Sequence, residues 1–296
     1  MNDLKDLFIK YKIKPLGYTF KNSVVIVRTK DDKFVFKRRN KDNRDLFNYL
    51  KLKGFNYCPF IYNMDSDDKY DIYKYYEDYN ISNNLKAIDL INIIGLLHSK
   101  TNYYKDVSKD DYKIIYENID KQIKDLNNYY DNLFKEINSH DYMSPSEYLL
   151  IRNITVIFSL LNNLNYELNS WYDLIKDSNK MRVCYIHNNL SLDHFIRNEK
   201  SYLISWDNAL IDMPIYDLYS FYINNYLDVD FNEILFIYEK YFPLLLEEKK
   251  LLFLLISIPN KIDFTNDEYD NTKKVTELLS YINKTFKVVS KYYSKK

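Results

Sequence analysis

Glycine is scarce in this chain: only 3 of its 296 residues are Gly, beside 6 Pro, 2 Cys and 2 Trp. This scarcity excludes collagen-like and glycine-rich linker architectures. Long hydrophobic runs are also missing, because the longest one, residues 251–259, is far shorter than the roughly 20 residues of a membrane-spanning helix. The two cysteines, Cys58 and Cys184, lie far apart in apolar surroundings, which predicts buried thiols in a reducing compartment rather than a disulfide framework.

An excess of either charge is absent too. Lys and Arg together number 42, as do Asp and Glu, so the formal net charge is +0. This balance gives no electrostatic footprint for nucleic acid or for an anionic membrane surface. The opening residues carry charges throughout and lack the apolar core of a signal peptide, so we expect a cytoplasmic protein.

The residues that are abundant indicate a globular protein of mixed structure. Apolar residues make up 46% of the chain, which is enough for a folded core. β-Branched and alternating segments favour strands near the N-terminus, and apolar residues at helical spacing favour helices after residue 79. The expected strands are residues 23–29, 33–39, 57–62 and 70–76, and the expected helices are residues 44–53, 87–98, 108–137, 144–161, 171–175, 218–226, 231–242, 247–258 and 270–292.

These elements predict an α+β fold with two lobes. Residues 1–78 form a small N-terminal lobe, an antiparallel β-sheet with one helix, and residues 79–296 form a larger, mainly helical C-terminal lobe. A turn is expected at residues 65–68, and Gly54 suits the end of the first helix.

Residues 183–219 hold the polar residues that most suggest a site. An apolar strand, 183–186, leads into a polar loop, 187–194, and a second short strand, 202–204, leads into an acidic loop, 205–217. Residues 198–201, directly before the second strand, suit a tight turn. Loop side chains held by flanking strands are placed more accurately than those on free loops, which makes this stretch the candidate site.

The same stretch resembles the catalytic core of the aminoglycoside phosphotransferase and choline kinase superfamily. That core reads His-Gly-Asp-(x)4-Asn, then Asp-Trp, then Asp-Pro-x-x-Asp-Leu/Ala. His187, Trp206 and Asp217 match it, and Asp212 with Pro214 approximates its Asp-Pro element. The resemblance implies a protein-kinase-like fold. Within the superfamily, the chain is most similar to the spore-coat-associated kinase-like proteins of Gram-positive bacteria.

Three positions depart from this pattern. Asn189 stands where the resemblance implies the catalytic Asp, His194 where it implies a metal-binding Asn, and Ser205 where it implies a metal-binding Asp. An amide cannot accept a proton at ordinary pH, and His prefers softer metals than Mg²⁺. Phosphoryl transfer needs a positioned proton acceptor and Mg²⁺, so the three departures argue against the family's chemistry.

Neighbouring residues leave alternatives open. Asp193 and Asp207 lie beside the altered positions and could recruit a metal in a displaced geometry, although carboxylates in loops are more often turn-formers or solvated charges. His187 fits a buried residue that braces the loop better than it fits a catalyst. Asp217 and Trp206 fit structural roles, with Asp217 either capping a helix that begins at Leu218 or bracing the loop before it.

The nucleotide side of such a site is also incomplete. Lys37 resembles the kinase Lys that contacts phosphate, although a Lys on an alternating strand is usually its solvated face. No Glu lies between residues 31 and 76 to pair with it. Gly17 is the only glycine before Gly54, so no glycine-rich loop is present to bring backbone amides close to phosphates.

The first hypothesis is a pseudokinase that has lost phosphotransferase chemistry and acts as a binding or scaffold protein with an unknown protein partner. The resemblance adds spore-coat assembly as a setting, and with it a spore-associated location. The alternative is an ATP-dependent small-molecule phosphotransferase with a rearranged metal site. A third possibility is nucleotide binding without transfer. The sequence by itself assigns no cofactor. ATP and Mg²⁺ are the expected ligands if the protein retains nucleotide binding or phosphotransferase activity.

Overall fold

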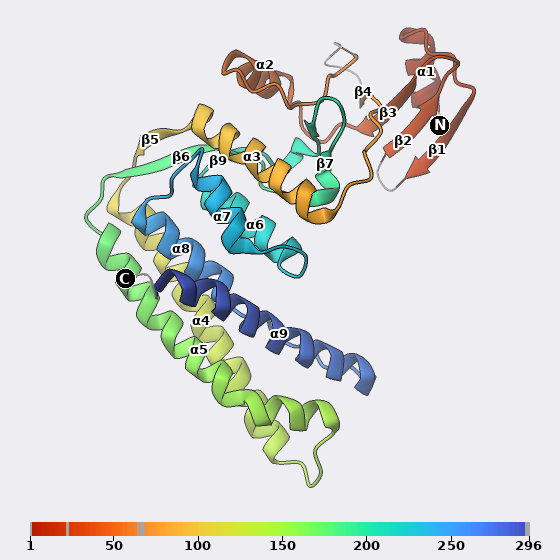
Figure 1. Ribbon diagram of the computed structural model, residues 1–296. Helices are drawn as coiled ribbons and strands as arrows, with labels where there is room; N and C mark the ends of the chain where they lie inside the picture. The colour runs from red at the N-terminus through yellow and green to blue at the C-terminus, as the bar shows by residue number, and fades with distance from the viewer. Residues whose placement is uncertain (1, 22–23, 64, 66–68, 294–296) are drawn as a thin grey trace.

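The computed structural model describes residues 2–21, 24–63, 65 and 69–293. Its N-terminal part is a small antiparallel sheet with the strand order β1-β2-β3-β4. The strands are β1 (Gly17–Lys21), β2 (Val24–Arg28), β3 (Lys33–Arg38) and β4 (Tyr70–Lys74), accompanied by helices α1 (Asn2–Lys10) and α2 (Arg44–Leu52). Figure 1 shows this part at one end of an elongated molecule.

Alternation along the strands decides which face of this sheet is covered. In β2 and β3 every second residue is buried, because successive side chains of a strand point to opposite faces. The buried face packs with apolar side chains of α1 into a small core of its own. That core contains Leu4, Leu7, Ile13, Val25, Val27, Phe34, Phe36 and Ile72. Lys37 therefore lies on the opposite face of β3, away from α1.

The rest of the chain is mostly helical. Its helices are α3 (Asn83–Thr101), α4 (Lys109–Asn138), α5 (Pro145–Ile175), α6 (Ile215–Asn225), α7 (Phe231–Glu239), α8 (Leu246–Ser257) and α9 (Glu268–Tyr293). The two longest, α4 and α5, pack side by side and project from the body, and α9 crosses them (Figure 1). Their buried stripes belong to one large hydrophobic core that continues up to α2.

Short strands set the candidate loops against this helical core. β5 (Tyr103–Asp106), β6 (Lys180–Ile186) and β9 (Leu210–Asp212) form a second antiparallel sheet with β6 in the middle. β7 (Phe195–Ile196) and β8 (Tyr202–Leu203) form a hairpin. The polar loop therefore runs from the end of β6 to the start of that hairpin, and the acidic loop runs from β8 through β9 to α6.

The predicted α+β class, with a small N-terminal antiparallel sheet and a mainly helical remainder, is confirmed. The predicted boundary after residue 78 falls in a segment, 75–82, that has neither helix nor strand, and the boundary itself stays a prediction. The predicted turn at 65–68 lies mostly outside the described residues. α1, β1, β5 and β9 were not anticipated, so the sheet lobe has two helices in its described part rather than one.

Two predicted elements were wrong. Residues 57–62 are not a strand, and only Ile61 bridges to Tyr73. Pro59 explains the failure, because proline has no N–H to give to a sheet. Residues 171–175 are not a separate helix but the end of α5, since no glycine or proline interrupts the chain between 162 and 170.

Two further findings concern the cysteines and the membrane. Cys58 is half-buried, Cys184 is buried, and neither forms a disulfide. Burial raises the pKa of both thiols, which keeps them protonated. In the described part of the chain, no helix combines the length and the apolar character needed to cross a bilayer.

Gly54 ends α2 with a φ of 75°, a conformation that residues with a Cβ adopt only under strain. We expect Gly54→Ala to lower the free energy of unfolding by about 1 kcal/mol, because an alanine there must take the left-handed conformation. Gly17→Ala is the matched control, since its added Cβ meets only the Arg28 side chain at 3.7 Å. Urea denaturation measures both, and an equal effect of the two substitutions would refute this account.

Candidate functional site

Lys37 of the sheet lobe reaches the acidic loop of the helical lobe. Its Nζ forms an ion pair with Oδ2 of Asp207, and both side chains are mostly shielded from solvent. Nearby, Lys41 Nζ donates to the carbonyl oxygen of Ala209 at 2.6 Å. Asp207 is thus held by a lysine of the sheet lobe, and a metal ion at this carboxylate would compete with that lysine for its negative charge.

The polar loop turns at an asparagine in the left-handed region. Asn188 has a φ of 55° and stands where the pattern that the chain resembles has Gly. Asparagine is one of the few residues with a side chain that tolerate this conformation. Ser205, the position implied for a metal-binding Asp, is likewise left-handed with a φ of 68°. Both loops therefore keep tight turns without glycine.

A fully buried carboxylate, Asp217, holds the start of the polar loop by hydrogen bonds to its backbone. One oxygen accepts the backbone N–H of Asn188 at 2.7 Å, and the other accepts the N–H of His187 at 2.8 Å. The second oxygen also lies 3.1 Å from Nε2 of the buried His98. Three donors converge on this group, which compensates for its removal from water.

The contact with Asp217 places a hydrogen on Nε2 of His98, because a carboxylate only accepts hydrogen bonds. The other ring nitrogen, Nδ1, lies 2.7 Å from the Tyr238 hydroxyl oxygen, so both nitrogens of this buried ring have a partner. Complete burial raises the pKa of Tyr238 well above its usual value, so that hydroxyl keeps its proton. The Leu97-His98 pair, which resembles a Leu-His element of the superfamily, pointed to His98, whereas no sequence pattern pointed to Tyr238.

His187 lies buried between the two loops. Its Nε2 donates to the carbonyl oxygen of Ile204 at 2.8 Å, and its ring meets the Trp206 ring edge-on with centroids 5.0 Å apart. Burial lowers the pKa of the His187 imidazole, which favours the neutral ring. Trp206 in turn donates its indole N–H to the carbonyl oxygen of Leu203 at 2.6 Å. These contacts connect the polar loop to the start of the acidic loop.

The altered positions of the pattern lie close to these residues. His194 Nδ1 donates to the backbone carbonyl oxygen of Asn189 at 2.8 Å, so the histidine stabilises the turn of the loop on which both residues lie. Asp193 is exposed on the short helix η1 (Leu192–His194) and its backbone N–H donates to the Ser191 hydroxyl. Asp217 lies in the first turn of α6, which begins at Ile215 rather than at Leu218.

The donor set does not fit Mg²⁺. This ion prefers several oxygen ligands, with carboxylates among them, whereas the positions implied for metal binding hold a serine and a histidine, and Asp207 is paired with Lys37. Among the described residues, no group of three or more His, Cys, Asp or Glu side chains is arranged to hold a metal ion.

Contacts also join the β7–β8 hairpin to the segment that links the lobes. The backbone N–H of Tyr79 donates to the Arg197 carbonyl oxygen at 2.8 Å, and the Asn198 side chain donates to the Glu77 carbonyl oxygen at 2.7 Å. The rings of Tyr76 and Tyr202 stack with centroids 3.9 Å apart. The hairpin thus occupies hydrogen-bonding groups of the linking segment.

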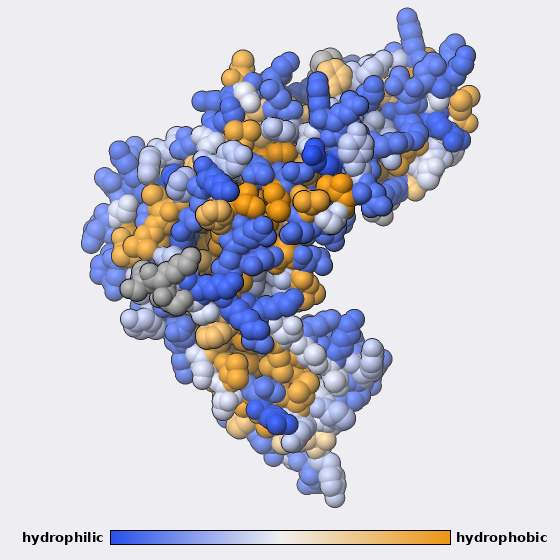
Figure 2. Space-filling view, in the orientation of Figure 1, coloured by the Kyte–Doolittle hydropathy of each residue, from blue (hydrophilic) through white to orange (hydrophobic). Residues whose placement is uncertain are grey.

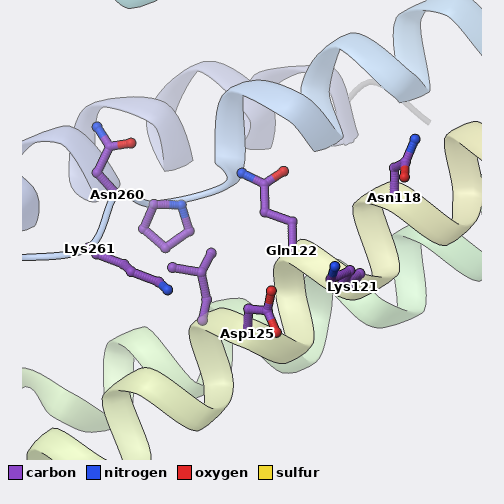
Figure 3. A pocket seen from close by; sticks show the side chains of 8 residues that line it. Asn118, Lys121, Gln122, Asp125, Asn260 and Lys261 are labelled. Carbon is purple, nitrogen blue, oxygen red and sulfur yellow. The ribbon is translucent and has the colours of Figure 1, made fainter.

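A separate hollow of about 360 Å³ lies far along the chain from these loops, between α4 and residues 259–261 (Figure 3). Polar side chains of α4, such as Lys121 and Asp125, line one side, and Asn260 and Lys261 line the other. None of the candidate site residues contributes to it.

No protein-family model matches the sequence, and no curated protein matches it. Solved structures of aminoglycoside phosphotransferases and choline kinases, which have a protein-kinase-like fold, do share the fold of this chain. An aminoglycoside phosphotransferase from Alicyclobacillus acidocaldarius matches with a TM-score of 0.69 and 10% identity, over 97% of this chain and 94% of the other.

Two further structures extend this comparison. A spectinomycin phosphotransferase bound to AMP has a TM-score of 0.59 and 15% identity, over 96% of this chain and 98% of the other. A choline kinase from Streptococcus pneumoniae has a TM-score of 0.50 and 16% identity, over 95% of this chain and 99% of the other. At such low identities, the similarity establishes the fold and leaves the activity open.

Removing the charge of Asp217 tests its support of the loop. We expect Asp217→Asn to lower the free energy of unfolding by about 3 kcal/mol, because the new amide turns a donor toward donors inside the core. Asp228→Asn, at an exposed position, should change it by less than about 0.5 kcal/mol. Urea denaturation followed by circular dichroism measures both, and similar values for the two variants would rule out the supporting role.

His187 predicts a pH dependence of stability. Its pKa is lowered in the folded protein, so the unfolded chain binds the proton more readily. The stabilising contribution is therefore complete above the unfolded pKa, near 6.5, and is lost as the pH falls through the lower folded value. We expect His187→Gln to be less stable than wild type at pH 7.5 and to lose less additional stability between about pH 7 and pH 5. Parallel slopes of the two proteins in that range would contradict the assignment.

Proposed function

We propose that this protein is a pseudokinase, a kinase-fold protein that binds a partner and does not transfer phosphate. The support comes from the candidate site. Asn189 stands at the position implied for the proton acceptor, and an amide takes up no proton. General acid–base help is typically worth about 10²–10⁴ in rate, so this change alone removes a large share of any activity.

The observation that carries the proposal is the ion pair between Lys37 and Asp207. In kinases, a lysine of the sheet lobe contacts the phosphates and acidic residues hold the metal ions. Here these two charges neutralise each other across the gap between the lobes. A phosphate that binds Lys37 would compete with Asp207 for the charge of the ammonium group.

A second candidate is an ATP-dependent small-molecule phosphotransferase with a rearranged metal site. One observation favours it: Asp207 follows directly after the position implied for the metal-binding Asp and faces Lys37. If Mg²⁺ and ATP together displaced the ion pair, Asp207 would gain a metal ion and Lys37 a phosphate. Nucleotide binding without transfer is the intermediate case.

The biological setting is part of the same proposal. The sequence resemblance to spore-coat-associated kinase-like proteins suggests a protein partner in spore-coat assembly, and a cytoplasmic or spore-associated location. A kinase fold that has lost its chemistry retains a large surface for such a partner, because function is carried by sites rather than by the fold itself.

The decisive measurement is phosphate transfer by the purified protein with ATP and Mg²⁺. Choline and spectinomycin serve as acceptors, because structures of a choline kinase and a spectinomycin phosphotransferase share the fold. Water is the third acceptor and tests for ATP hydrolysis. We expect no transfer above the uncatalysed background, since the proton acceptor and the metal ligands are replaced.

If phosphate transfer is observed, variants show whether it comes from the rearranged metal site. Turnover that disappears in Asp207→Asn or in Asp193→Asn but persists in the exposed control Asp228→Asn would refute the pseudokinase and establish the rearranged site. Thermal shift with ATP, with and without Mg²⁺, separates the remaining cases, because a ligand that binds only the folded state raises the melting temperature. A shift without turnover indicates nucleotide binding alone.

A further inference from the structure

The outer strand of the sheet lobe, β1, exposes aromatic side chains on an otherwise buried face. Tyr18 and Phe20 lie opposite the buried Val27 and Val25 of β2, so all four belong to the same face. Yet Tyr18 is 46% exposed and Phe20 is 63% exposed. Their rings contact each other edge-on, with centroids 5.7 Å apart. Helix α1 covers the apolar residues of β2 and β3 and leaves those of β1 open.

The strand is open along its edge as well. Within the described residues, β1 pairs with β2 and with no other strand. About half of the N–H and C=O groups of such an edge point outward and can pair with another strand. Leu16, directly before β1, is 70% exposed and extends the apolar surface. Figure 2 shows small hydrophobic areas among hydrophilic residues at the end of the molecule that the sheet lobe forms.

Three lysines lie in β1 or in the segment before it. Lys12 and Lys14 lie in the segment that enters β1, and Lys21 is its last residue. In the part of the chain that the structure describes, these three lysines form no ion pair with a carboxylate. Lys21 points to the face opposite Tyr18 and Phe20, because residues of odd and even number alternate along a strand. The edge thus offers aromatic contacts on one face and a cation on the other.

We propose that β1 is the docking edge for an extended acidic segment of a partner protein. The segment adds a strand beside β1, its apolar residues pack on Tyr18 and Phe20, and its carboxylates, on the other face, lie on the side of Lys21. Backbone pairing supplies affinity, and the alternation of apolar and acidic residues supplies specificity. The proposal rests on the proposed binding function and names the chemistry of the partner.

Other occupants fit this edge less well. A second copy of the chain would bring the lysines of two β1 edges together, which like charges oppose. A nucleic acid would use the lysines and the rings but not the backbone edge, and the balanced charge of the whole chain does not favour it.

The test uses a fluorescein-labelled peptide of four Glu-Val repeats and fluorescence anisotropy with the full chain. Its valines all lie on one face of a strand and its glutamates on the other. The matched control peptide has the same composition arranged as Glu-Glu-Val-Val repeats, which places both residue types on both faces. We expect the control to bind at least about tenfold more weakly, and binding of the alternating peptide to weaken as salt is added.

Variants locate the binding. Tyr18→Ser with Phe20→Ser, and separately Lys21→Glu, should each weaken binding of the alternating peptide by about tenfold. Phe286→Ser on α9 is the matched control, because Phe286 is 69% exposed and far along the chain. All these side chains are exposed, so unchanged melting temperatures should show that the variants remain folded.

Several outcomes would overturn the docking edge: no binding of the alternating peptide, equal binding of both peptides, no effect of the β1 variants, or tighter binding of a single-stranded oligodeoxythymidine. The transfer assay on the same preparations keeps the two proposals separate. Turnover would refute the pseudokinase without bearing on β1, and lost peptide binding would refute the docking edge without restoring any chemistry.

Discussion

The geometry of the candidate site depends on one buried carboxylate. Asp217 accepts the backbone N–H groups of His187 and Asn188 and the imidazole N–H of His98, and its side chain is completely buried. A charge in that position is stable only while its donors stay in place. The polar loop, helix α3 and helix α6 are therefore fixed relative to one another, whatever the loop itself does chemically.

The two loops above this carboxylate differ in how they are held. The polar loop is tied to the helical lobe by Asp217, whereas the acidic loop is tied to the sheet lobe through Lys37 and Lys41. Both lobes thus meet at Asp207 and Ala209. A kinase needs its charged groups free for phosphate and metal. In this chain Lys37 and Asp207 pair with each other and so join the sheet lobe to the acidic loop.

The surface of the sheet lobe is covered unevenly. Helix α1 covers the core beneath β2 and β3 and leaves the aromatic side chains of β1 exposed. Within the described residues β1 pairs with β2 alone, so one edge of this strand has no partner. Strands at sheet edges attract other strands, and lysines are one means of protecting them. The lysines in and before β1 oppose a strand of like charge, and the proposed acidic segment would complement them.

The sequence alone determined the fold class, most helices, strands β2 to β4 and the stretch that carries the site, because hydrophobic periodicity and motif spacing are local signals. Local apolar content alone was misleading in two places: it predicted a strand at residues 57–62, which contain Pro59, and a separate helix at residues 171–175, which are the end of α5. Only the tertiary structure brought Lys37 to Asp207, 170 positions apart, and His98 with Tyr238 beneath Asp217. Such pairings depend on how whole elements pack, and no spacing along the chain records which surfaces will meet.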